Sequence, residues 1–221
     1  MDLKEFEKHF FNQKSVNSDH FDKNYFEGDW REEKMSYSLE SRRQIEGQNP
    51  HNIVKFLKPT KALDVGCGPG SLIALLEEEG FKGCHGIDIS SDAISEAPEK
   101  IKDRLFIGDC TKMEFPSNSF DLIICREVLE HLTIREIVST VKEICRISNN
   151  YIYVTTRFHP NPKTIYDYTT EFEADPTHIT CLNIEMLRLL FILNGFKREV
   201  SIEKQIDWQN KGRVLIYKKV F

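Results

Sequence analysis

A glycine-rich turn carries the clearest chemical signal in this chain of 221 residues. The stretch that begins at Lys61 reads KALDVGCGPGSL, in which Gly66 and Gly68 fit the G-x-G-x-x-G pattern of dinucleotide sites. Ser71 stands where the third glycine belongs, and Gly70 lies one residue earlier. Because glycine permits a sharp turn and a close approach of the backbone to a ligand, the turn predicts a nucleotide-bearing ligand. The displaced glycine leaves open which one it is.

Three carboxylates lie where apolar stretches around this turn end. Asp64 precedes the turn, Asp88 ends the next apolar stretch, and Asp109 ends the one after that. A carboxylate near a helix N-terminus repels a pyrophosphate, whereas it attracts an ammonium or sulfonium group. Asp88 is placed to accept both ribose hydroxyls, and Asp109 to accept a hydrogen bond from an exocyclic amine. The set favours a cationic nucleoside over a dinucleotide.

These residues are positioned by strands that alternate with helices. The predicted strands are 61–65, 82–90, 104–109, 120–126, 150–156, 197–203 and 213–220, and the predicted helices are 41–57, 71–80, 91–100, 133–147 and 183–196. Pro50 is expected to bend or divide the first helix. The alternation predicts an α/β fold with a doubly wound sheet, whose ligands bind at the carboxyl ends of the strands. No helix is predicted between the last two strands, so we expect them to pair antiparallel.

The motifs ALDVGCGPG, GIDIS, GDC and FDLIICREVLEHL, in this order and spacing, closely resemble the class I S-adenosylmethionine-dependent methyltransferases. The resemblance covers residues 41–221 and implies one methyltransferase domain. It implies a seven-stranded, mostly parallel sheet of order 3-2-1-4-5-7-6 with strand 7 antiparallel, and S-adenosylmethionine as the cofactor. The aromatic residues 1–40 are expected to form an N-terminal arm that serves as a lid or simply packs on the domain.

The resemblance also implies which residues bind the cofactor. The glycines of the turn would face its methionine and ribose portions, and Asp64 its ammonium. Asp88 would hold the ribose hydroxyls, while Ile89 would pack on adenine and Asp109 would bind the adenine amine. The implied set is Asp64, Gly66, Cys67, Gly68, Gly70, Asp88, Ile89, Asp109, Cys110, Cys125 and Arg126. The alternatives are a turn former for Asp64, a helix cap for Asp88 and a loop carboxylate for Asp109.

Two histidines are the candidate catalytic residues. Methyl transfer from a sulfonium needs alignment of acceptor and donor, and a hydroxyl acceptor also needs its proton removed. His131 follows the fourth strand and serves either as this base or as a residue that orients the loop. His178, in the element Asp175-Pro176-Thr177-His178, either faces the acceptor or stabilises its loop.

Further candidates come from the loop 157–182, for the acceptor site, and from the arm, for the cofactor site. A loop of this length in a compact domain is more often functional than idle. Its candidates are Arg157, Phe158, His159, Tyr166 and Tyr168. In the arm and just after it, Tyr37 with Arg42 or Arg43 is expected to meet the methionine carboxylate of the cofactor.

Composition restricts the function further. Thirty Lys and Arg against 35 Asp and Glu give a net charge of −5, which argues against broad affinity for nucleic acid. With no long apolar run and scattered cysteines, we expect a cytoplasmic protein without a membrane span, disulfides or metal. The predicted function is methyl transfer to a small molecule, on oxygen of a metabolite or sugar-linked substrate. The alternatives are an RNA or protein methyltransferase and a cofactor-binding protein without transfer; oligomeric state is left open.

Overall fold

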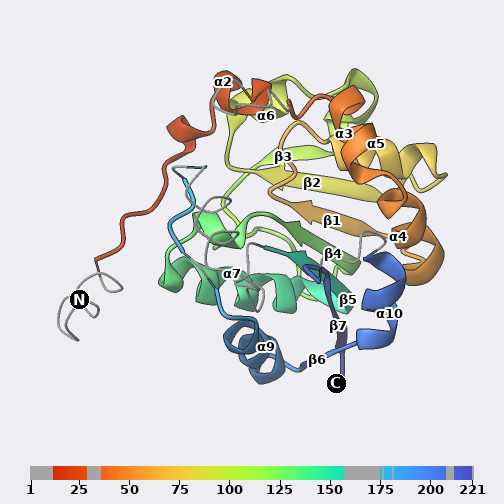
Figure 1. The fold of residues 1–221 in the computed structure, drawn as a ribbon, viewed down its shortest axis with the longest axis vertical. Coiled ribbons are helices and arrows are strands. Elements are labelled where there is room, and N and C mark those ends of the chain that lie inside the picture. The colour runs from red at the N-terminus through yellow and green to blue at the C-terminus, as the bar shows by residue number, and fades with distance from the viewer. Residues whose placement is uncertain are drawn as a thin grey trace.

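The computed structural model describes residues 12–28, 36–156, 175, 177–180, 182–207 and 212–220. Its centre is a seven-stranded sheet of order β3-β2-β1-β4-β5-β7-β6 (Figure 1). The strands are β1 (Ala62–Val65), β2 (Cys84–Asp88), β3 (Leu105–Ile107), β4 (Phe120–Arg126), β5 (Ser148–Thr155), β6 (Phe196–Arg198) and β7 (Leu215–Lys219). β1 to β5 are parallel, and β7 runs antiparallel to both of its neighbours. The predicted order and the antiparallel strand are confirmed.

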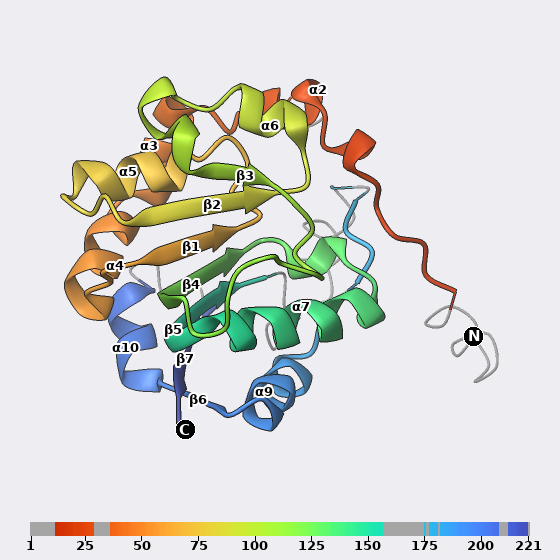
Figure 2. The same ribbon diagram turned by 180° about the vertical axis from the view of Figure 1, so that it is seen from behind.

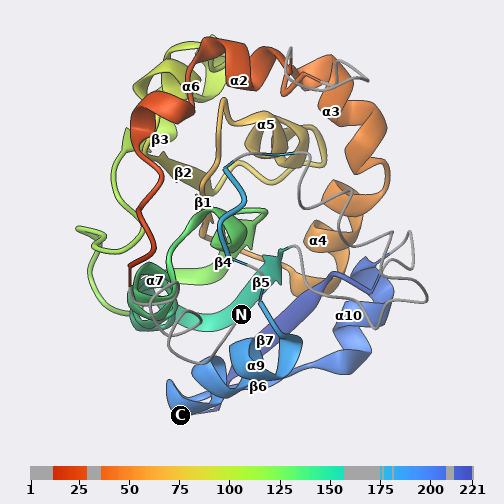
Figure 3. The same cartoon turned by 60° about the vertical axis from the view of Figure 1, so that its left-hand side comes forward.

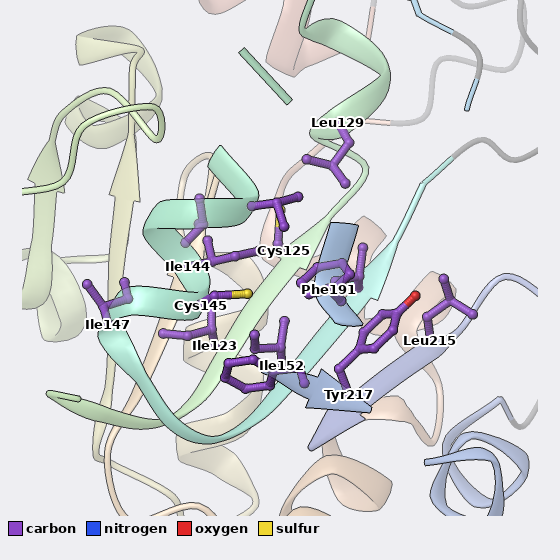
Figure 4. Close-up of a cluster of buried hydrophobic side chains, with 14 of the residues drawn as sticks. Ile123, Cys125, Leu129, Ile144, Cys145, Ile147, Ile152, Phe191, Leu215 and Tyr217 are labelled. Carbon is purple, nitrogen blue, oxygen red and sulfur yellow. The ribbon is translucent and has the colours of Figure 1, made fainter. Parts of the chain in front are cut away.

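Helices cover both faces of the sheet (Figure 2). The described ones are η1 (Ser18–His20), α2 (Lys23–Glu27), α3 (Leu39–Glu46), α4 (Asn49–Leu57), α5 (Ser71–Glu78), α6 (Ser91–Ser95), η2 (Glu99–Arg104), η3 (Leu129–His131), α7 (Ile134–Ile147), α9 (Ile184–Leu193) and α10 (Val200–Ile206). Successive strand residues alternate between two cores: Ile123 packs with α7 and α9, and Ile124 packs with α4, α5 and α10. Figure 4 shows the first core. The doubly wound prediction is confirmed.

Local sequence sets several helix ends. Pro50 divides the predicted helix 41–57: α3 ends at Glu46, and α4 begins at Asn49 with the proline in its first turn, where its missing N–H costs nothing. α7 begins with a capping box, in which Thr133 and Glu136 each bind the other's backbone N–H. This cap fixes the path of the chain between β4 and α7.

The predicted strand 197–203 is wrong beyond Arg198. β6 ends there, and α10 follows between β6 and β7, so the expectation of no intervening helix is also wrong. The alternation of Val200 and Ile202 resembles a strand, but Ile202 and Ile206 are four residues apart and pack on the same core. The buried carboxylate of Glu203 accepts hydrogen bonds from Arg198 and from the backbone N–H of Ile216, which ties the helix to both strands.

β2 passes very close to the glycine-rich turn. A Cβ atom added at Gly86 would lie 2.6 Å from Cys67 Sγ, 2.7 Å from Ile73 Cδ1 and 2.8 Å from Leu105 Cδ2. These distances are far below van der Waals contact, so only glycine lets side chains of the turn, α5 and β3 meet at this point of the strand.

The arm lies along the edge where the parallel strands end (Figure 3). Its backbone is held by side chains of the domain: Ser90 donates to the carbonyl of Phe21, and Ser71 donates to that of Tyr37. Gln13 of the arm donates to the carbonyl of Ile179, which precedes α9 in the chain. The use of the arm as a lid stays a prediction. Among the described residues, no helix has the length and apolarity that a membrane crossing requires.

Candidate functional site

A cavity of about 1430 Å³ lies at the carboxyl ends of β1, β2, β4 and β5, between these strand ends and the arm. The residues predicted from the sequence that line it are Asp64, Gly66, Cys67, Gly68, Asp88, Ile89, Asp109, Cys110, Arg126, His131 and His178. Residues far apart in the chain thus meet in one place, because parallel strands end at the same edge of the sheet.

Gly70 and Cys125 were predicted with this set but do not line the cavity. Gly70 stands at the start of α5 with φ of 76°, and a Cβ there would lie 2.7 Å from Ile101 Cδ1, so the missing side chain lets the turn pack against Ile101. Cys125 is fully buried in the core with α7. Because side chains alternate along β4, Arg126 rather than Cys125 reaches the cavity.

The Asp88 carboxylate is fixed by the backbone around it. The N–H of Gly68 donates to Oδ2 at 2.7 Å, and the N–H of Ser90 donates to Oδ1 at 2.8 Å. Burial raises the pKa of Asp88, and these hydrogen bonds oppose the rise. The residue that caps α6 is Ser90, whose side chain accepts from Ala93, so Asp88 is not the helix cap. An ionised carboxylate has about four acceptor positions, so Asp88 keeps room for a further donor.

Asp109 is exposed at the rim of the cavity. Its Oδ1 accepts a hydrogen bond from the N–H of Thr111 at 2.7 Å, which orients the side chain at the end of β3. Ile89 also lines the cavity and is 42% exposed, so its side chain offers apolar surface to a ligand. Both positions are open to a flat ring that enters beside β2 and β3.

A buried ion pair, which was not predicted, lies at the other end of the glycine turn. Arg126 Nη1 is 2.8 Å from Glu46 Oε2, and Asn49 donates to the same carboxylate at 2.8 Å. The Nε atom of Arg126 is buried without a hydrogen-bond partner among the described residues. Glu46 ends α3 and carries no motif; no local pattern shows that its charge is buried. Only its contact with Arg126, 80 residues away, reveals it.

Asp64 lies beside this pair and is 4% exposed. Burial raises the pKa of its carboxyl to about 7, although Arg126 lowers it. A carboxyl that keeps its proton to this pH is poised to ionise when a cation binds next to it. The binding role of Asp64 stays a prediction.

Asp64 should make the cofactor-free protein less stable as pH rises. Its pKa is 3.8 unfolded and about 7 folded, so between these values the folded state holds the extra proton and stability falls with pH, by up to about 4 kcal/mol. In urea denaturation, Asp64→Asn should exceed the wild-type free energy of unfolding at alkaline pH, and the excess should shrink below pH 4. The exposed variant Asp103→Asn should follow the wild type, and an excess that does not depend on pH would contradict the assignment.

The two predicted histidines lie together. Their ring centroids are 4.8 Å apart, and the ring of Phe21 from the arm makes a T-shaped contact with His131, with centroids 5.5 Å apart. His131 Nδ1 is 2.8 Å from Thr177 Oγ1, and His178 Nε2 is 3.7 Å from Asp175 Oδ2. Burial and the neighbouring imidazole lower the pKa of His131 to about 4, so the ring is neutral at pH 7. Sequence reasoning missed the roles of Asp175 and Thr177 as partners of the two rings.

The arm contributes aromatic side chains to the cavity wall. Phe26 lies against Gly68, where an added Cβ would be 3.3 Å from its ring, and Tyr37 stacks under the guanidinium of Arg42 at 3.9 Å. Of the two arginines considered, Arg42 lines the cavity, whereas Arg43 pairs with Glu78 outside it.

Some predicted residues lie outside the described part of the chain. These are Arg157, Phe158, His159, Tyr166 and Tyr168, together with residues 1–11 and 29–35 of the arm. Glu130, His131 and His178 offer possible metal-binding atoms within 4.8 Å of one another. Glu130 already accepts from Thr156, and His131 already bonds Thr177. The absence of a metal stays a prediction.

Known proteins resemble this chain in sequence and fold. Residues 63–150 match the family model described as a methyltransferase domain. Over 82 residues the chain is 40% identical to phosphoethanolamine N-methyltransferase 3 of Arabidopsis thaliana, a match that covers 34% of this chain and 17% of that relative. The chain thus spans only a small part of the length of this curated relative.

Two solved structures share the fold. An S-adenosylmethionine-dependent methyltransferase from Archaeoglobus fulgidus gives a TM-score of 0.66 at 22% identity, over 88% of this chain and 98% of that one. The magnesium protoporphyrin IX methyltransferase of Synechocystis, with S-adenosylmethionine bound, gives 0.58 at 18% identity, over 99% and 98%. At these identities the likeness concerns the fold, and it agrees with the strand order described above.

Proposed function

We propose that this chain carries a class I methyltransferase domain and uses S-adenosylmethionine to methylate an oxygen of a small molecule. The observation that carries the proposal is one cavity lined both by the backbone-fixed Asp88 and by the neutral His131. The proposed nucleoside site and the proposed base for a hydroxyl proton thus share one cavity. A cytoplasmic location is part of the same proposal.

The cofactor supplies a methyl group that is already activated by its sulfonium. In the proposed site, Asp88 accepts the ribose hydroxyls with its remaining lone pairs, Ile89 packs on adenine, and Asp109 accepts from the adenine amine. The methionine end lies toward Asp64 and Arg126. There the raised pKa of Asp64 allows ionisation in response to an ammonium, and the buried Nε of Arg126 offers a donor to a carboxylate.

His131 is proposed as the base because of its charge state. A neutral imidazole at pH 7 takes up the proton that a hydroxyl loses as its oxygen is methylated, whereas an imidazolium has no lone pair to do so. Phe21 and the rest of the described arm cover this side of the cavity, which supports the exclusion of water from the reaction.

The test is transfer of tritium from labelled cofactor into fractionated cell extract. We expect label in the small-molecule fraction, as a methyl ether or ester, and a loss of about a hundredfold in rate for His131→Gln. His51→Gln, an exposed histidine paired with Glu79 outside the cavity, is the matched control and should keep full activity. Label in RNA or protein would reject the small-molecule acceptor. Tight cofactor binding with no product in any fraction would reject the enzyme.

A further inference from the structure

Asp175 is held as an anion that only accepts hydrogen bonds. Burial raises its pKa, but hydrogen bonds from the Thr177 side chain and backbone, and the two nearby imidazoles, outweigh burial and leave the pKa below its usual value. The backbone N–H of Thr177 donates to Oδ1 at 2.9 Å, and the Thr177 hydroxyl donates to the same oxygen. From the arm, Tyr25 donates its hydroxyl to Oδ2 at 3.1 Å.

This arrangement fixes the direction of the next hydrogen bond. A hydroxyl has one proton, and that of Thr177 is committed to Asp175. At the contact of 2.8 Å between Thr177 Oγ1 and His131 Nδ1, the oxygen must therefore accept, and Nδ1 must carry the proton. A neutral imidazole has only one N–H, so Nε2 of His131 has a free lone pair.

We propose that Asp175 and Thr177 are positioning residues, which hold His131 in the tautomer whose Nε2 accepts the proton of the acceptor hydroxyl. The hydrogen-bond chain runs from Asp175 through the Thr177 hydroxyl to His131 Nδ1. The inference rests on the proposed function for its catalytic meaning, but the tautomer itself follows from hydrogen-bond geometry alone. It also gives Asp175 and Thr177 a role that does not require contact with the substrate.

The surroundings of His131 are compatible with this task. The charged or titratable groups near its ring include His178, Asp175 and Glu127, and a carboxylate oxygen of Glu130 lies within 4.8 Å of one of its nitrogens. From the arm, Phe21 presents an apolar ring. His178 lies 3.7 Å from Asp175 Oδ2, so both imidazoles have the same carboxylate as neighbour. Because Tyr25 also bonds this carboxylate, the described arm helps to fix the same chain of hydrogen bonds.

The tautomer can be measured without turnover, by imidazole nitrogen NMR of the full chain. In the wild type we expect the His131 proton on Nδ1, and in Thr177→Val a mixture of both tautomers. Thr177→Ser keeps the hydroxyl and should restore the wild-type spectrum. A wild-type proton on Nε2, or a spectrum of Thr177→Val identical to that of the wild type, would overturn the proposal even if transfer activity were absent.

Kinetics supply the second readout. In Thr177→Val, kcat should fall about tenfold or more, while KM for the cofactor stays within about twofold, and Thr177→Ser should recover most of the rate. Thr180→Val makes the same change in the same segment at a residue that bonds Gln13 instead, and it should keep the wild-type tautomer. If Thr177→Val does not fold, Asp175→Asn tests the chain from its other end. Equal loss in the serine and valine variants would mean a merely structural role.

Discussion

Replacing Asp88 with asparagine should weaken the binding of S-adenosylmethionine by roughly a hundredfold. The carboxylate already accepts the N–H groups of Gly68 and Ser90 and is proposed to accept two ribose hydroxyls as well. Hydrogen bonds to a charged group contribute about 1.5–3 kcal/mol each. An amide loses the charge and turns an N–H₂ group toward one set of donors, so a loss of about 3 kcal/mol is expected. Titration calorimetry of the cofactor measures it directly.

Asp92→Asn is the matched control for this experiment. Asp92 lies four residues away in α6, is exposed and does not line the cavity, so the same loss of charge should change the dissociation constant by less than about twofold. If the Asp88 variant, with an unchanged melting temperature, bound the cofactor as tightly as the control does, then the ribose would not lie at the end of β2.

Breaking the buried ion pair should have the second large effect. In Arg126→Met the carboxylate of Glu46 loses its ion-pair partner and keeps the hydrogen bond from Asn49 and the weaker attraction of Arg42. Leaving a buried charge without its partner costs about 3–5 kcal/mol. Arg126 also counteracts the effect of burial on the pKa of Glu46, which is held below its usual value, so the variant carboxyl should take up a proton. Urea denaturation without cofactor measures the stability loss.

The double variant Arg126→Met with Glu46→Leu separates charge from packing. Replacing both partners with apolar groups removes the unpaired charge, so most of the lost stability should return. Cofactor affinity should not return, because the guanidinium is proposed to face the methionine carboxylate. A double variant no more stable than Arg126→Met alone would show that the side chain acts through shape rather than charge.

The central strands of the sheet could be predicted because each is a continuous apolar run that is flanked by polar or turn-forming residues. Residues 120–126 form β4 with the predicted limits, since a short apolar run of this length is typical of a central parallel strand that is buried on both faces. α10 was not predictable from local pattern. The three apolar positions Val200, Ile202 and Ile206 do not decide between the two periods. The packing of Ile202 and Ile206 in the core with α4, and the hydrogen bond that ties Glu203 to β7, decide for a helix.

The candidate site residues that stand at strand ends could be predicted from the sequence. Those whose roles depend on partners far away in the chain could not. Asp64, Asp88 and Asp109 stand at positions that the fold brings together. Glu46 and Tyr25 act through partners that lie 80 and 150 residues away, so no pattern in their neighbourhood shows their roles. Which of Arg42 and Arg43 faces the cavity was likewise undecidable, because neighbours on a helix point in different directions and the helix phase is set by packing.

Gly86 has a consequence for how this protein can diverge. The space of one missing methyl group is shared by Cys67, Ile73 and Leu105, which come from the turn, α5 and β3. A substitution that enlarges position 86 is tolerable only after one of these three side chains has become smaller, and the effects of such changes are not additive. The four positions are therefore epistatic, and the order in which they mutate matters. Changes in the glycine-rich turn and changes in the core beneath it depend on one another.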